Sequence, residues 1–138
     1  MVSDKAIRQG LYQALNVAAV TGSLAEGSAS LRHAVAPPTG LFPFVIFNKV
    51  SGTPTRRFGG NAFDSQIWLV KAVARDTSSS AAEDIAKAID DLLDFGTITV
   101  SGATLLFLAR ESDVDYAETD GDQTYRHHGA LYRVAIAT

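Results

Sequence analysis

The stretch "FPFVIFNKV", residues 42–50, restricts the possible folds of this chain more than any other segment. It is dense in β-branched and aromatic residues, which favour strands, and its apolar side chains would fall on both faces of a strand. That pattern is typical of a strand that is covered on both sides and lies centrally in its sheet. The segment therefore predicts a protein built in layers around a β-sheet.

A second strand is predicted in "FDSQIWLVKAVA", residues 63–74. Ile67 and Leu69 alternate along it with Gln66 and Trp68, which is the period of two that a strand requires. We expect the two strands to pair as an antiparallel hairpin. The segment between them is then an over-long loop.

This loop contains Arg56, Arg57 and Phe58 before a pair of glycines, and no catalytic pattern lies near it. Two cations beside an aromatic ring could hold a single-stranded nucleic acid, although such binders usually interleave more basic and aromatic residues. The same residue types are enriched at the energetic centres of protein interfaces. A solvated connection without a partner is the third interpretation.

A first helix is predicted over residues 3–18. The Ser3 hydroxyl can accept a backbone N–H that has no partner within the helix, and Ile7, Leu11 and Leu15 then repeat at helical spacing. One face of this helix is therefore expected to pack on the sheet.

A second helix is predicted over residues 80–94. Ser80 and Glu83 form a capping-box pattern at its start, and Gly96 follows its end. Its apolar stripe consists of Ile85, Ala88, Ile89 and Leu92.

The last turn of this second helix carries three aspartates, Asp90, Asp91 and Asp94. Carboxylates are mildly unfavourable there, because the helix dipole places its negative end at the C-terminus. The sequence offers these residues no obvious local partner. We therefore expect a role other than helix stability to keep them.

The segment of residues 21–40 mixes glycine and serine with the pair Pro37-Pro38, which removes two backbone donors. We expect irregular chain here, with a short strand over residues 31–35. Further on, Ser101-Gly102 predicts a tight turn, since glycine accepts a positive φ angle.

Three more strands are predicted, over residues 97–100, 104–110 and 125–137. The complete order is α-β-β-α-β-β-β. This order indicates an α+β protein, with one antiparallel sheet and two helices that bury their apolar stripes on it. A length of 138 residues fits a single domain over residues 1–138.

Composition excludes several classes of protein. The chain has no cysteine, so it has neither disulfides nor a thiolate metal site. No apolar run approaches the roughly 20 residues that span a bilayer, and the first residues lack the apolar core of a secretion signal. The formal net charge of −3 argues against a protein that binds duplex DNA. Synthesis in the cytoplasm is expected.

The sequence supplies weak candidates for metal or acid–base chemistry. His127 and His128 are adjacent, so in a strand they point to opposite faces and cannot hold one ion together. The acidic run that starts at Asp113 lacks the glycine and glutamate spacing of a calcium loop. Asp120-Gly121 is better interpreted as a hairpin turn. We expect no enzymatic activity, cofactor or metal.

The order of these segments resembles the tail terminator, or tail completion, family of long-tailed phages and gene transfer agents. The resemblance covers most of the chain. It depends on "PFVIFNKVSGTP" after the proline-rich stretch, on "DSQIWLVKAVARD" before the alanine-rich helix "AAEDIAKAIDDLL", and on the final run from "ITVSGATLLFLARES" to "HGALYRVAIA".

The resemblance implies a structural virion protein that caps the tail tube as a hexameric ring and joins it to the head. Its implied partners are further copies of itself, the major tail tube protein and a head-side connector or stopper protein. DNA would pass through the ring without being specifically bound. The resemblance also implies a location at the head-proximal end of the tail.

Two alternatives remain open, namely another head–tail connector or neck protein and a small nucleic-acid-binding module. In the terminator interpretation, Arg56, Arg57 and Phe58 reach Asp90, Asp91 and Asp94 on a neighbouring subunit, or reach a partner ring. Contacts that link one surface to a different surface on the next copy are what a closed ring requires.

Overall fold

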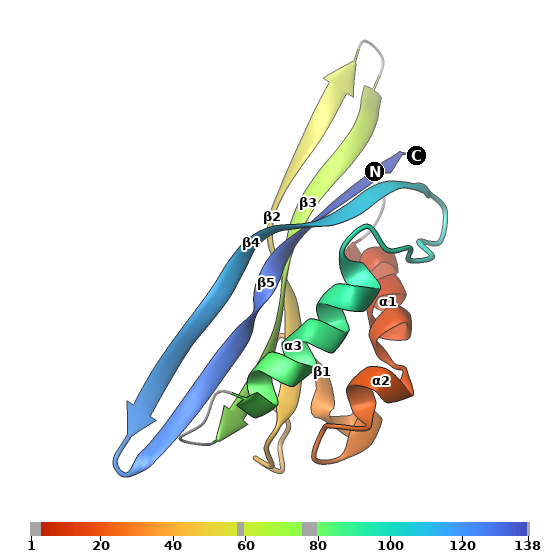
Figure 1. Cartoon of the computed structure of the whole chain (residues 1–138). Coiled ribbons are helices and arrows are strands. Elements are labelled where there is room, and N and C mark those ends of the chain that lie inside the picture. The colour runs from red at the N-terminus through yellow and green to blue at the C-terminus, as the bar shows by residue number, and fades with distance from the viewer. Residues whose placement is uncertain (1–3, 58–59, 76–79, 138) are drawn as a thin grey trace.

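Five strands form one sheet in the order β1-β2-β3-β5-β4, and every neighbouring pair is antiparallel except β1 with β2. The computed structural model describes residues 4–57, 60–75 and 80–137. The strands, seen in Figure 1, are β1 (Leu31–His33), β2 (Phe44–Arg57), β3 (Gly60–Arg75), β4 (Thr104–Asp120) and β5 (Gln123–Ala137).

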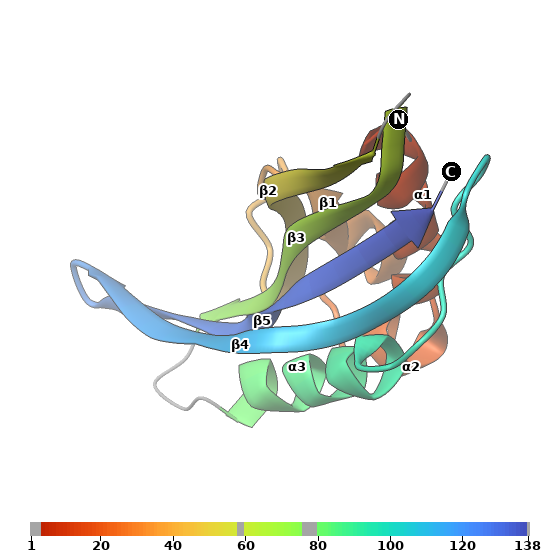
Figure 2. The same ribbon diagram turned by 90° about the horizontal axis from the view of Figure 1, so that it is seen from above.

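The helices all lie on one side of the sheet, as Figure 2 shows from above. They are α1 (Asp4–Leu15), the short α2 (Ala18–Thr21) and α3 (Ser80–Leu93), with a single 3₁₀ turn η1 (Gly27–Ser30). The α+β class is confirmed. The predicted order of elements and the predicted count of two helices are not confirmed. The helix α2 was not predicted, and the strands occupy other positions in the sequence than predicted.

The first helix is shorter than predicted, because Val17 has an extended backbone (φ −129°, ψ 155°) that separates α1 from α2. The cap predicted at Ser3 lies outside the described residues. None of the helices in the described part of the chain is long and apolar enough to cross a membrane.

The predicted over-long loop is wrong, because most of it belongs to strands. β2 and β3 stay paired as far as Arg57 and Gly60, with Arg56 opposite Asn61. β5 pairs with β3 only as far as Asp64, so the end of the β2–β3 hairpin projects beyond the body (Figure 1). We call this end, residues 54–57 and 60–63, the β2–β3 tip.

The strand predicted over residues 97–100 is also wrong, so Ser101-Gly102 joins no hairpin. The tight turn predicted there is present, and Gly102 has the positive φ angle of 80°. The segment of residues 97–100 is extended but has no partner strand, and it is anchored instead by burying Ile98 and Val100. It lies against α1 at Gly10, where an added Cβ would sit 2.4 Å from the carbonyl oxygen of Thr99. A helix backbone therefore takes the place of the expected neighbouring strand.

The last two strands form a long hairpin that projects in a direction different from the β2–β3 tip (Figure 1). Its turn lies where Asp120-Gly121 predicted one. Asp120 pairs with Gln123, and Gly121 has the positive φ angle of 61° that favours glycine. The acidic run that follows Arg110 is therefore strand rather than loop.

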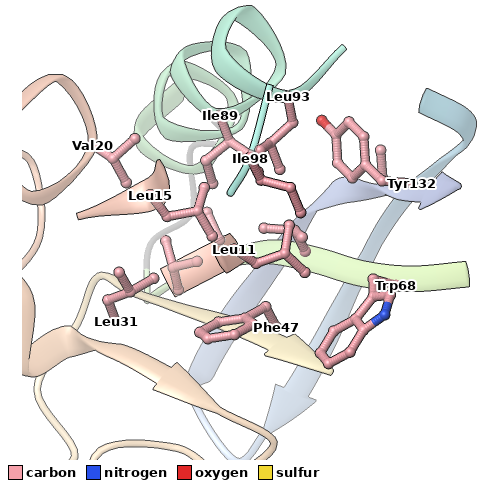
Figure 3. Packing of buried hydrophobic residues seen from close by; sticks show 14 of the residues in the cluster. Leu11, Leu15, Val20, Leu31, Phe47, Trp68, Ile89, Leu93, Ile98 and Tyr132 are labelled. Carbon is pink, nitrogen blue, oxygen red and sulfur yellow. The ribbon is translucent and has the colours of Figure 1, made fainter. Parts of the chain in front are cut away.

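The core lies between the helices and the sheet face that carries Trp68 (Figure 3). Leu93, not Leu92, is the fully buried residue at the end of α3, because residues 85, 89 and 93 follow one another at intervals of four. Leu92 lies partly buried beside them. The side chains around this core include Leu11, Leu15, Phe47, Ile89, Leu93, Ile98 and Tyr132.

The expectation that β2 is covered on both sides is only locally correct. No described helix lies on the second face of the sheet (Figure 2). At one end of this face Phe42 packs against Phe44 and Tyr125, with ring centroids 5.0 and 5.3 Å apart. Elsewhere on this face, residues such as Ile46, Ile67 and Leu69 are only partly buried.

Candidate functional site

The three aspartates at the end of α3 all have partners within the chain. This differs from the sequence-based expectation that they have no local partner. Asp91 pairs with Lys87 at 3.0 Å. Asp94 accepts the backbone N–H of Arg110 at 2.9 Å. Asp90 accepts a hydrogen bond from the buried Tyr132 hydroxyl at 3.0 Å. The contacts of Asp90 and Asp94 tie the end of α3 to the strands that it covers, whereas the contact of Asp91 lies within the helix.

The contact between Asp90 and Tyr132 is the centre of a small polar cluster. Burial, followed by the hydrogen bond to Asp90, raises the pKa of Tyr132 well above its usual value. The phenol is therefore a neutral donor at physiological pH. Arg110 lies 3.6 Å from Asp90 and 3.4 Å from Asp113, so it joins α3 electrostatically to β4.

Arg56 and Arg57 lie at the end of β2, on the β2–β3 tip, and Phe58 lies outside the described residues. The tip points away from the helices in Figure 1. The fold therefore does not bring the two arginines to the aspartates of α3 within one chain. An interface role for either set stays a prediction.

The two adjacent histidines face different surroundings. His127 is buried, stacks on Tyr116 with ring centroids 4.3 Å apart and contacts the Glu118 carboxylate. Burial first, then the charge of Lys71, lowers the pKa of His127. His128 lies 3.3 Å from Asp115. Within residues 4–57, 60–75 and 80–137, no group of three or more His, Cys, Asp or Glu residues could hold a metal ion.

Sequence reasoning missed a groove of about 670 Å³ between α1 and β1. Arg8 and Tyr12 line it from the helix, Arg32 and His33 line it from the strand, and Val35 lies beyond them. The short strand near residue 31 was predicted, but nothing in the sequence indicated that it would lie beside the first helix. We call this feature the α1–β1 groove.

Comparisons with known proteins agree with this architecture. Residues 6–136 match the family model of tail completion protein gp17. The chain therefore belongs to the tail completion protein family, which makes it a structural component of a phage-type tail and so of a virion. No curated protein sequence matches it significantly.

Two solved structures have similar folds. One is a chain from the "Virion of native gene transfer agent (GTA) particle", with a TM-score of 0.74 and 15% identity over 97% of this chain and 96% of that one. The other superposes with a TM-score of 0.59 and 16% identity, again over 97% of this chain and 96% of its own. At 15% and 16% identity, these two similarities show a shared fold and nothing further.

Proposed function

We propose that this protein forms a hexameric ring that caps the end of the tail tube, stops its polymerisation and joins the tail to the head-side connector. The observation that supports this proposal most directly is the shape of the sheet. Two hairpins project from it in different directions, one with Arg56 and Arg57 and the other with an acidic strand. A subunit of this shape offers separate surfaces to neighbours within a ring and to partners outside it.

The β2–β3 tip is proposed to contact a partner ring or the tube, rather than α3 of a neighbouring subunit. Asp90 and Asp94 already accept hydrogen bonds within their own chain. Reorienting Asp90 toward a neighbour would leave the hydroxyl of the buried Tyr132 without its acceptor, which costs about 1–3 kcal/mol. We expect the β2–β3 tip, whose sequence includes Arg56 and Arg57, to meet an acidic surface on another protein instead.

The test combines a mass measurement with an assay of tube length. Six copies of the 14.6 kDa chain give about 88 kDa, and the contact must be head-to-tail, since a two-fold contact closes at a dimer. We expect a species of this mass, either free in solution or on tube ends, and tubes that stop growing when the protein is added. Tubes that bind no protein and grow unchanged would contradict the proposal.

A further inference from the structure

We propose that the α1–β1 groove is the site where the acidic end of the β4–β5 hairpin of the next copy docks. This inference rests on the proposed ring and identifies the two surfaces that meet in it. We call the second surface the acidic arm, which comprises residues 111–125 of β4, the turn and β5.

The groove is basic and partly apolar. None of its described lining residues is acidic, whereas Arg8 and Arg32 both line it. Neither arginine makes an ion pair with any residue in the described part of the chain. Val35 exposes 65% of its surface beside them. Two unpaired guanidinium groups next to exposed apolar surface are typical of a protein interface.

The environment of His33 supports the positive character of the groove. Burial and the charge of Arg8 lower the pKa of this histidine, so an added proton is unfavourable there. A negatively charged occupant would relieve this repulsion. The groove therefore suits a carboxylate-bearing segment better than a neutral or basic one.

The acidic arm has the complementary charge. It contains six carboxylates and no lysine or arginine. Four of them have partners in their own chain, since Glu111, Asp113, Asp115 and Glu118 contact Arg133, Arg110, His128 and His127. Asp120 and Asp122, beside the turn, are exposed and have no ion-pair partner among the described residues. These two carboxylates are available to a neighbour.

The positions of the two surfaces fit a ring. β1 and β4 are the opposite edges of the sheet. The β4 side of one copy then meets the β1 side of the next. Each copy therefore uses one surface toward one neighbour and a different surface toward the other neighbour. This arrangement is heterologous and closes into a ring when the rotation permits. A second copy of the chain therefore supplies the occupant without a further protein.

Charge reversal and mixing test the proposal. The groove variant carries Arg8→Glu with Arg32→Glu, and the arm variant carries Asp120→Lys with Asp122→Lys. Each variant alone should form rings at a concentration at least about tenfold above wild type, because like charges would meet at every contact. An equimolar mixture should form rings nearly as well as wild type, since the two variants can alternate around an even-numbered ring. Native mass spectrometry measures both quantities.

A matched control separates local contacts from net charge. Lys5→Glu with Lys87→Glu changes the net charge as much as the groove variant does, but both lysines are exposed and lie outside the groove. This control should form rings as wild type does. Circular dichroism and thermal melting establish that each variant is folded.

A disulfide trap tests the same contact without reversing charge. The chain has no cysteine, so Val35→Cys in one copy and Thr119→Cys in another supply the only pair. Their mixture should give a cross-linked dimer under oxidising conditions, and Val35→Cys with Asp84→Cys should not.

The outcomes distinguish this inference from the proposed function. Rings that form normally in both charge variants, or a mixture that fails to restore them, overturn the inference and leave the capping ring intact. Rings that form without the Val35–Thr119 cross-link also overturn it. Wild-type protein that forms no ring, even on tube ends, overturns both.

Discussion

Trp68 donates its indole N–H to Oε1 of Gln66 at 2.8 Å, on the face of β3 that the helices cover. Gln66 in turn donates to Oδ1 of Asp4 at 3.0 Å, at the start of α1. Lys49 completes the group by binding the same carboxylate at 3.1 Å. The first turn of α1 is therefore attached to the sheet by a chain of polar contacts that begins in the core.

Replacing Gln66 should destabilise the protein through Trp68. Gln66→Leu removes the acceptor of a buried indole N–H, so the free energy of unfolding should fall by about 1–3 kcal/mol. Trp68 is the only tryptophan, so its fluorescence reports the urea transition directly. The control is Gln13→Leu, which changes an exposed glutamine on α1 and should leave the transition nearly unchanged. Equal transitions for the two variants would contradict the assigned hydrogen bond.

Two neighbouring leucines on α3 should differ strongly in their contribution to stability. Leu93 is fully buried, so Leu93→Ala should cost about 2–5 kcal/mol through lost burial and the cavity left behind. Leu92 is only partly buried, and Leu92→Ala should cost clearly less. Urea denaturation of both variants measures the difference. A larger effect at Leu92 would mean that α3 is rotated about its axis.

Acidification should destabilise the protein through His127. Because its pKa is lowered in the folded state, this residue contributes stability that is complete above pH 6.5 and is lost as the pH falls through the lowered value. His127→Phe keeps an aromatic ring against Tyr116 but cannot take up a proton. The free energy of unfolding should therefore fall less between about pH 7.5 and about pH 5.5 in this variant than in wild type. Equal losses in the two proteins would assign the pH dependence to other groups.

Charge reversal at the β2–β3 tip should impair capping while rings still form. Arg56→Glu with Arg57→Glu replaces attraction by repulsion toward an acidic partner, and the effect should be larger at low salt, where charges are least screened. Tube length by electron microscopy is the measurement. If the tip instead meets α3 of a neighbour, ring formation itself should weaken, and adding Asp90→Lys with Asp91→Lys should partly restore it. Unchanged capping and ring formation would mean that the tip is simply solvated.

The parts of the fold that could be predicted are those with a strong local period. The centre of β3, most of α3 and the closing strand β5 have apolar residues at the spacing of their own element, and the centre of β2 is a continuous run of β-branched and aromatic residues. The segment of residues 97–100 has the same alternation as a strand, yet its neighbour is α1. A segment that packs against a helix can therefore have the same sequence pattern as a strand that pairs within a sheet.

The strand ends could not be predicted, because pairing continues into residues that have no apolar pattern of their own. Thr53 and Thr55 extend β2 because they pair with residues of β3. The partners of Asp90 and Asp94 could not be predicted either, because they are distant in sequence. Arg110 and Tyr132 are distant in sequence from Asp90, and only the packing of α3 on β4 and β5 brings them together.

The continuity of β2 has a mechanical consequence. This strand carries Phe47 in the core and Arg56 at the tip, and its pairing with β3 is interrupted by a register shift between Lys49 and Ser51. Such an irregularity bends the strand locally. The β2–β3 tip is therefore joined to the body of the sheet through an irregular step next to Lys49, whose side chain binds Asp4 at the start of α1. We expect any force on the tip to act on the strands that α1 covers.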